Sequence, residues 1–171
     1  MAFVWTKFIY LIRDSDKMKK IMVLLFSFAK IEEVIKEVKK SIDDSTQEIH
    51  LCFYQNKDVP DTLQSLMGVY LGEKIQKDVE NTILKEYFRM KEEITQRFKL
   101  LSKDNHITVK NQLFKSYSRD EIYKYIKKHD IDFLVVNYFK NKYNSQRVFT
   151  DIEKEFLDNI EVEYKLFKHL N

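Results

Sequence analysis

Side chains able to bind an anion follow two continuously apolar segments of the chain. Ile21–Phe26 and Asp130–Asn137 are rich in valine, isoleucine and leucine, and the polar residues Ser27 and Asn137 stand where these runs end. The segment after the second run adds three cationic side chains, Lys140, Lys142 and Arg147. Lysine and arginine bind phosphate through their charge, and arginine also through paired N–H donors. These five residues are therefore the candidate ligand-binding residues, for a nucleotide or another anion.

A second interpretation of the same segment needs no ligand. Tyr138, Phe139 and Tyr143 could stack on a base, but a solvated loop whose aromatic residues pack on neighbouring elements accounts for them as well. Ser27 lacks the Gly-x-Ser-x-Gly surroundings of a catalytic serine, and no base can be assigned to it. We therefore expect no catalytic residue and no enzymatic activity.

The four histidines do not indicate a metal site. They are scattered along the chain, at positions 50, 106, 129 and 169. No His, Cys or carboxylate at metal-site spacing accompanies His50, which we expect to be a packed or partly exposed strand residue. His106 and His129 flank predicted elements, so we expect both on the surface. No bound metal or cofactor is predicted.

Composition and charge exclude several classes of protein. The 171 residues include 30 basic and 27 acidic side chains, and this net charge of +3 is too small to favour nucleic-acid binding. Phe3–Ile12 is apolar and aromatic but shorter than the roughly 20 residues that cross a membrane. A lone cysteine, Cys52, excludes an intramolecular disulfide. Its apolar neighbours predict a buried, unreactive thiol, which is compatible with a cytoplasmic location.

Two kinds of hydrophobic pattern alternate along the chain and predict an α/β fold. Short runs of apolar or alternating residues indicate strands, and apolar residues every three or four positions indicate helices. The strands are expected at 21–26, 49–54, 107–110, 130–137 and 162–166, and the helices at 31–42, 74–102, 118–129 and 150–160. Residues 138–149 are expected to form a polar, aromatic loop and residues 168–171 a frayed tail. Strands that are apolar on both faces fit a parallel sheet with helices on each side.

Two local features leave more than one interpretation open. Ser27 could begin the turn into the first helix by accepting from an early helical N–H. The long helix at 74–102 could cover the sheet within one domain, which we favour, or form a coiled-coil seam between two chains. Its apolar positions include aromatic residues at irregular spacing, which argues against the seam.

This order of elements resembles the universal stress protein (UspA-like) family over about residues 18–167. The resemblance rests on Lys19-Lys20-Ile21-Met22-Val23-Leu24, then Ile49-His50-Leu51 after one helix, a long second helix, and Asp132-Phe133-Leu134-Val135-Val136 after a short third helix. Membership would imply a Rossmann-like three-layer sandwich with a five-stranded parallel sheet in the order 3-2-1-4-5. It would also imply a homodimer formed through the C-terminal strand.

The phosphate motif of this family does not carry over to the chain. Many members bind ATP with a signature of Gly, two residues, Gly, nine residues, Gly, then Ser or Thr after the fourth strand. Those positions correspond here to Asn137, Lys140, Thr150 and Asp151, so every glycine is replaced and an acid stands at the hydroxyl position. Glycines let backbone N–H groups approach phosphate oxygens closely, and these side chains would obstruct that approach. The acidic residue that such members carry after the first strand is also missing, because Phe26 leads into Ser27.

The sequence thus predicts an N-terminal extension at 1–17 and a UspA-like domain at 18–171. The extension could pack on the core or on a second subunit, or bind a partner. The favoured function is a stress-related regulatory or interaction domain that does not bind ATP in the usual way, with a protein partner still to be identified. The alternative is a small-molecule protein that binds a nucleotide or other anion through Lys140, Lys142 and Arg147. Neither nucleic acid nor membrane is expected as a partner.

Overall fold

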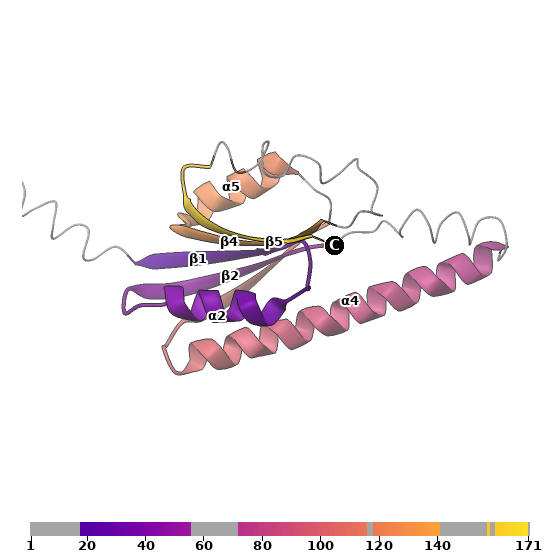
Figure 1. The fold of residues 1–171 in the computed structure, drawn as a ribbon, viewed down its shortest axis with the longest axis horizontal. Helices are drawn as coiled ribbons and strands as arrows, with labels where there is room; N and C mark the ends of the chain where they lie inside the picture. Colours follow the sequence, from indigo (N-terminus) through magenta and orange to yellow (C-terminus); the bar gives the residue numbers. More distant parts are fainter. Residues whose placement is uncertain (1–17, 56–71, 116–117, 141–156, 158–159, 171) are drawn as a thin grey trace, which may run out of the picture.

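The computed structural model describes residues 18–55, 72–115, 118–140, 157 and 160–170, which form five strands and three helices (Figure 1). The strands are β1 (Lys19–Leu25), β2 (Thr46–Tyr54), β3 (Thr108–Phe114), β4 (Phe133–Lys140) and β5 (Glu163–Leu170). The helices are α2 (Ile31–Ser41), α4 (Gly72–Lys103) and α5 (Arg119–His129). The N-terminal extension, the helix predicted at 150–160 apart from Leu157 and Ile160, and most of the segment after β4 lie outside the described residues.

The five strands form one parallel sheet in the order β3-β2-β1-β4-β5, which is the order that the resemblance noted in the sequence implies. Ile21 of β1 lies between Ile49 of β2 and Phe133 of β4, so the two most apolar runs are direct neighbours. Parallel strands need crossover connections, and the intervening helices supply them on the two faces of the sheet. Alpha-helix α5 covers one face, and α2 and α4 cover the other (Figure 1).

Strand β1 is buried on both faces. All five residues from Ile21 to Leu25 are fully buried, and they divide by parity between two apolar cores. Met22 and Leu24 belong to the core under α5, whereas their odd-numbered neighbours pack under α2 and α4. The three-layer arrangement follows from this pattern, because a strand without a polar face needs an element on each side.

Helix α5 begins and ends at the residues that the sequence marks. The Ser118 hydroxyl accepts from the Glu121 N–H at 3.3 Å, as the capping pattern predicts. Asp130 takes the left-handed conformation, with φ at 51°, and its N–H donates to carbonyls of the last turn. This reverses the chain sharply enough for β4 to start at Phe133. Ile122 and Ile126 form the buried side of the helix.

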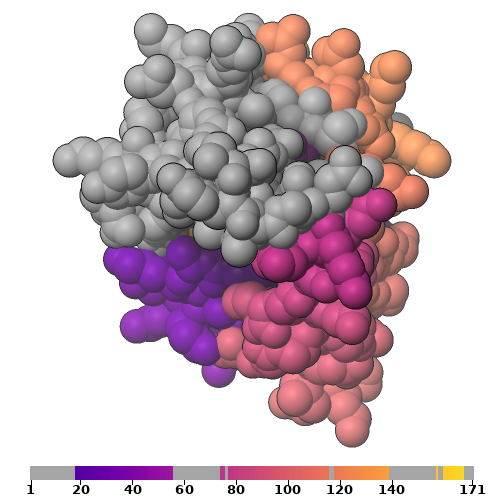
Figure 2. Space-filling model, turned by 90° about the vertical axis from the view of Figure 1, so that its right-hand side faces the viewer, coloured from indigo at the N-terminus to yellow at the C-terminus, as the bar shows by residue number. Residues whose placement is uncertain are grey.

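Helix α4 has 32 residues, and its C-terminal part covers the sheet. Ile94 and Phe98 are buried in the core, next to α2, to which α4 is also joined by an ion pair between Arg97 and Glu32. In Figure 2 the indigo atoms of the N-terminal elements lie beside the magenta and pink atoms of α4. Nearer its amino end, α4 extends past the sheet in Figure 1, and Ile75 and Ile83 are exposed. The C-terminal part therefore fits the interpretation of a sheet-covering helix within one domain.

Two boundaries predicted from the sequence are wrong. Residues 138–140 continue β4 instead of opening a loop, and residues 168–170 continue β5 instead of fraying. The two extensions pair with each other, Tyr138 with Lys168 and Lys140 with Leu170. Tyr138 explains the first error, because this residue looks polar in the sequence but is buried in the core under α5. Among the described helices, none has the length and hydropathy needed to cross a membrane.

We predict that truncating Phe98 to alanine lowers the free energy of unfolding by about 3–5 kcal/mol, because it leaves a cavity between α4 and the sheet. Leu100→Ala on the same helix is the matched control, since Leu100 is 68% exposed. Its effect should stay within about 0.5 kcal/mol. Urea unfolding monitored by circular dichroism measures both changes. Equal losses in the two variants would mean that this turn of α4 does not rest on the sheet.

Candidate functional site

The carboxyl ends of β1 and β4 meet in the middle of the sheet, where open parallel sheets usually bind ligands. Asn137 of β4 lies beside Leu25 of β1, and the chain continues from Leu25 into the loop that contains Ser27. The structure therefore brings together Ser27 and Asn137, the two polar residues that the sequence places at the mouth of a crevice. Both sides of this junction belong to the described part of the chain.

Asn137 uses its side chain to fasten the loop after β1. The side chain is fully buried, and its amide nitrogen donates to the carbonyl oxygens of Ser27 at 2.8 Å and Ala29 at 2.9 Å. Its main-chain carbonyl accepts from the Phe26 N–H at 3.0 Å. Both amide hydrogens are therefore directed at the protein itself. Asn137 ties the loop to β4, so its amide is not free to bind an anion in this conformation.

Ser27 also has an internal role. Its hydroxyl accepts from the Ala29 N–H at 3.0 Å and so stabilises the turn between β1 and α2. Ser27 thus begins the turn into α2, as expected, but its donor is the Ala29 N–H and not a helical one, because α2 starts at Ile31 after Lys30, which has no side-chain cap bond. Lys30 takes a left-handed conformation, with φ at 49°. The Asn137 contacts to the carbonyls just before it help to hold this strained turn.

The three cationic candidates are only partly covered by the structure. Lys140 is the last residue of β4, and only its backbone is described. Lys142 and Arg147 lie outside the described residues, as do Thr150 and Asp151 of the expected phosphate motif. Whether the three cations gather at one point therefore stays a prediction.

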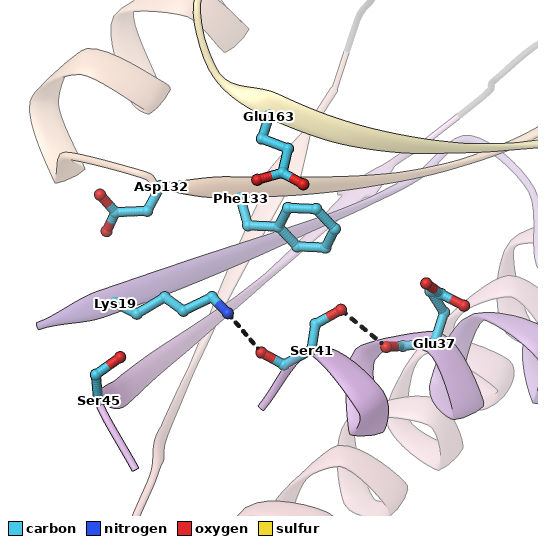
Figure 3. Close-up of a pocket in the computed structure, with 7 residues that line it drawn as sticks. All are labelled: Lys19, Glu37, Ser41, Ser45, Asp132, Phe133 and Glu163. Carbon is cyan, nitrogen blue, oxygen red and sulfur yellow. Dashed lines mark hydrogen bonds between the residues drawn. The ribbon is translucent and has the colours of Figure 1, made fainter. Parts of the chain in front are cut away.

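A hollow of about 460 Å³ lies at the opposite, amino end of the sheet, between α2 and the first residues of β1, β4 and β5 (Figure 3). Its walls are Lys19, Glu37, Ser41, Ser45, Asp132, Phe133 and Glu163. In Figure 3 the Lys19 amine points to the carbonyl of Ser41, with the Phe133 ring nearby on β4. The hollow combines an aromatic surface with charges of both signs.

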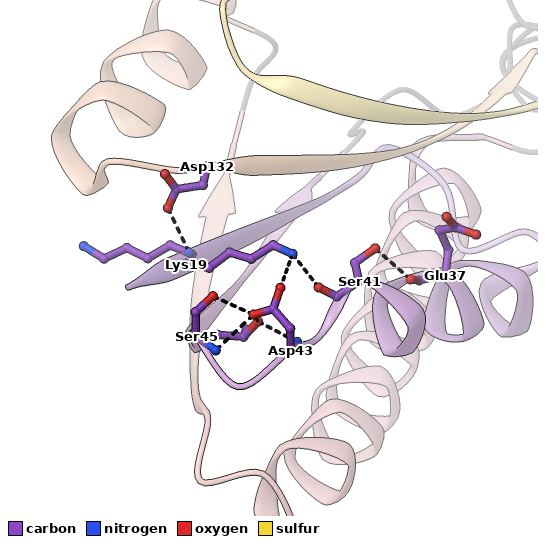
Figure 4. Close-up of polar contacts among 8 residues, drawn as sticks. Lys19, Glu37, Ser41, Asp43, Ser45 and Asp132 are labelled. Atoms are coloured by element: carbon purple, nitrogen blue, oxygen red, sulfur yellow. Dashed lines mark hydrogen bonds and ion pairs between the residues drawn. The ribbon is translucent and has the colours of Figure 1, made fainter. Parts of the chain in front are cut away.

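The polar groups around this hollow bind one another (Figure 4). The Lys19 amine donates to the Ser41 carbonyl at 2.7 Å and to the Asp43 carboxylate at 2.9 Å. Hydrogen bonds from Ser45 and Lys19, together with a weaker one from Thr46, hold the pKa of Asp43 well below its usual range. The Asp132 carboxylate accepts from the Lys20 N–H at 3.0 Å. These contacts join the α2–β2 turn and the start of β4 to β1, which is a structural role.

A third polar group, centred on His50, lies under α5. His50 is fully buried, and its ring nitrogens lie 2.9 Å from the Tyr125 hydroxyl and 2.8 Å from the Glu48 carboxylate. Glu48 is held in turn by the amine of Lys110, at 2.8 Å. The expectation of a packed strand histidine is confirmed. No group of three His, Cys, Asp or Glu residues in the described ranges could hold a metal ion.

The polar group around His50 also includes His129, which the sequence does not indicate. His129 was expected on the surface and apart from the other histidines, but it is half-buried, and its ring centroid lies 5.0 Å from that of His50. Two patterns could have revealed the group. Glu48 and His50 are two positions apart, which places them on one face of a strand, and Tyr125 and His129 are one helical turn apart. The sequence does not show that this face of α5 packs against β2.

Solved structures of other proteins share the fold of this chain. No protein-family profile and no curated protein sequence matches the chain. Among solved structures, MJ0577 superposes with a TM-score of 0.55 at 16% identity, covering 91% of this chain and 99% of its own. PH0823 superposes with a TM-score of 0.50 at 14% identity, covering 90% and 97%. UspA from Lactobacillus plantarum gives 0.47 at 15% identity, covering 88% and 98%.

The chain has the universal stress protein fold. The resemblance noted in the sequence is confirmed at this level, including the strand order β3-β2-β1-β4-β5. Cys52 is buried, as predicted, and burial raises the pKa of its thiol far above the usual range. A thiol in this state is a poor nucleophile, which agrees with the unreactive role expected for it.

We predict that Asn137→Ala destabilises this universal stress protein fold by about 1–3 kcal/mol, because the carbonyls of Ser27 and Ala29 lose their donor. Asn137→Asp should cost more at neutral pH, since a carboxylate would then face two carbonyl oxygens. Such a group has a raised pKa in the folded state, so part of the loss should be recovered as the pH falls towards 4.

Chemical unfolding at pH 7 and at pH 4 tests this assignment. Asn105→Ala is the control, because the amide of Asn105 also donates to a main-chain carbonyl, that of Leu101 at 3.1 Å, but in an exposed position. Its effect should remain below about 0.5 kcal/mol. An Asn137→Ala variant as stable as this control would show that the loop does not depend on the amide.

Proposed function

We propose that the chain is a regulatory or protein-interaction domain with the universal stress protein fold, which does not bind ATP in the usual way and catalyses no reaction. The observation that carries the proposal is the continuation of β4 through Asn137 to Lys140. These two residues occupy the positions at which the first two glycines of the phosphate motif would stand. In this chain they belong to a strand that pairs with β5.

A phosphate cradle needs several consecutive N–H groups that converge on one point, usually with glycine in a left-handed conformation. In a paired strand, successive N–H groups point to opposite sides and donate to neighbouring strands. Asn137 and Lys140 lie opposite Phe167 and Leu170 of β5. Backbone committed to this ladder supports the view that no cradle forms at its usual place.

The other wall of the usual site supports the same proposal. The loop after β1 begins Phe26-Ser27, without the acidic residue that ATP-binding members carry there. The carbonyls of Ser27 and Ala29 accept from Asn137, so the loop is drawn onto β4. A ligand entering between these elements would have to displace three hydrogen bonds, counting the one between Phe26 and Asn137. We also propose that the domain acts in the cytoplasm, because the free thiol of Cys52 is compatible with a reducing compartment.

Calorimetric titration with ATP, AMP and cyclic nucleotides tests the proposal. We expect no binding at micromolar ligand, because the cradle positions are side-chain-bearing strand residues. Micromolar binding that is abolished in the Lys140→Ala/Arg147→Ala variant would refute the proposal and establish the alternative, an anion-binding protein. Lys30→Ala serves as the control for a general loss of positive charge, because Lys30 is exposed and lies before α2.

We also propose that the domain forms a homodimer through β5. Among the described residues this strand ends the sheet, and Tyr164 on it is 44% exposed. Edge strands with apolar side chains tend to pair with a second chain. Strand β3 ends the described sheet at the other edge, where Asn111 is exposed.

Sedimentation velocity over a series of protein concentrations measures the assembly. We expect a dimer that Tyr164→Glu weakens at least tenfold, because the substitution places a carboxylate at a strand interface, a cost of more than about 1.4 kcal/mol. Asn111→Glu adds the same charge at the opposite edge and should leave the dimer unchanged. A monomer at every concentration, or equal weakening by both substitutions, would contradict a dimer through β5.

A further inference from the structure

The polar group under α5 connects three elements through a single buried imidazole. His50 of β2 contacts Glu48 on its own strand and Tyr125 on α5, and Glu48 in turn binds Lys110 of β3. The rings of His50, Tyr125 and His129 form a triangle, in which the centroid of Tyr125 lies 5.7 Å from that of His50 and 4.3 Å from that of His129. Apart from this group and a bond from the Lys20 amine to the His129 carbonyl, α5 meets the sheet mainly through apolar side chains. His50 is thus the main polar attachment of α5 to the sheet among the described residues.

The partners of His50 define its resting protonation state. Hydrogen bonds from Lys110 and His50 lower the pKa of Glu48 to about 2, so Glu48 is an ionised acceptor near neutral pH. The Nε2 atom of His50 therefore carries the hydrogen that is donated to Glu48. Burial raises the pKa of the Tyr125 phenol far above neutrality, so its hydroxyl remains a donor, and it donates to the bare Nδ1 atom. Both ring nitrogens are satisfied while His50 is neutral.

A second proton on His50 disrupts this arrangement. It would have to occupy Nδ1, which now accepts from Tyr125, so the hydroxyl would have to turn and donate elsewhere. Burial is the largest cause that lowers the pKa of His50, and the opposing effect of Glu48 is weaker. Positive groups also lie around the site, Lys20 on β1, Lys110 on β3 and Lys128 on α5, and a proton on His129 would add another. The single carboxylate is already shared with Lys110.

We propose that the Glu48–His50–Tyr125 group is a proton-linked latch, which holds α5 against the sheet at neutral pH and releases it on acidification. Strand β2 is fixed by hydrogen-bonded neighbours on both sides, whereas α5 has 11 residues held mainly by side chains. The Lys20 amine adds one bond, to the His129 carbonyl at 3.1 Å. Separation at this interface therefore moves α5.

The direction of the effect follows from proton linkage. When α5 lifts, His50 becomes hydrated and regains an ordinary pKa near 6.5, above that of the closed state. The open state thus binds more protons below about pH 6.5, and opening becomes easier as the pH falls. From pH 7 to about pH 5.5, one such histidine raises the opening equilibrium of α5 by roughly three- to tenfold. Opening uncovers the apolar core that contains Cys52.

Hydrogen–deuterium exchange at pH 7 and pH 5.5, corrected for the intrinsic exchange rate at each pH, measures this opening on the intact chain. We expect protection of residues 119–129 to fall three- to tenfold at the lower pH, while α2 and the C-terminal part of α4 change less than twofold. A uniform loss of protection over all three helices would instead indicate global destabilisation and overturn the proposal.

Substitutions separate His50 from its neighbour His129, whose pKa is also lowered by burial. His129→Gln should keep at least a threefold effect, and His50→Gln, which retains a donor towards Glu48, should lose most of it. The exposed His106, in a left-handed conformation that suits asparagine, provides the control His106→Asn, which should behave like the parent chain. If His129→Gln lost the pH dependence of α5 protection while His50→Gln kept it, the responsible histidine would be His129, and the proposal would be refuted.

A second measurement keeps the test decisive if His50→Gln is unstable. Cys52 is the only cysteine, and it is fully buried under α5, so a disulfide probe such as 4,4′-dithiodipyridine reacts only after opening. The ratio of the labelling rates of native and denatured protein removes the intrinsic pH dependence of the thiol. We expect this ratio to rise three- to tenfold from pH 7 to about pH 5.5 in the parent chain and in His129→Gln. A ratio independent of pH would overturn the proposal.

Discussion

The burial of five successive residues of β1 on both faces is the constraint on which the rest of the structure depends. Ile21 to Leu25 are fully buried in succession, so neither face of this strand can meet water. Such a strand must lie in the interior of a sheet, with a neighbour on each side and a layer of helix above and below. Beta-strands β2 and β4 supply the neighbours, and α5 on one face and α2 with α4 on the other supply the layers. The strand order and the three-layer arrangement both follow from that burial.

The same constraint creates a difficulty at the carboxyl end of β1. The chain must leave a buried strand and turn back over the sheet, and main-chain groups in that turn need partners. A glycine-rich turn at such a point would leave room for an anion, whose oxygens can accept from backbone N–H groups. Here an asparagine side chain supplies donors to two loop carbonyls instead. The Asn137 amide thereby supplies hydrogen-bond donors for the two carbonyls. A bound phosphate could not replace them, because it would not donate to carbonyls.

The strands and helices could be predicted because they depend on local patterns, whereas the strand order followed from the resemblance to a known family. Ile21–Phe26 is apolar at every position, and Ser118 followed by Glu121 marks a helix start, so both could be placed without knowing their neighbours. The ends of β4 and β5 were missed, since Tyr138 and His169 look like loop or tail residues until the two strands are paired. Pairing across 30 residues of sequence is a tertiary property, which single-residue propensity does not contain.

The candidate sites were less predictable for the same reason. The sequence placed Ser27 and Asn137 correctly at one edge of the sheet, because both follow central strands. It could not show that Asn137 would donate to the loop, since that depends on the path of the main chain from residue 26 to residue 30. His50 and His129 are 79 positions apart, and only the pairing of α5 with β2 brings their rings together.

The two faces of the sheet consequently differ in how they respond to their surroundings. The core under α2 and α4 is built from apolar side chains, whose packing is insensitive to pH over the neutral range. The core under α5 adjoins a histidine, a tyrosine and a carboxylate, whose hydrogen bonds depend on one another. A buried polar group of this kind fixes the position of a helix when fully satisfied and weakens it when one partner changes. Near neutral pH the proposed sensitivity to protons therefore concerns α5, and the apolar core under α2 and α4 can remain intact while α5 moves.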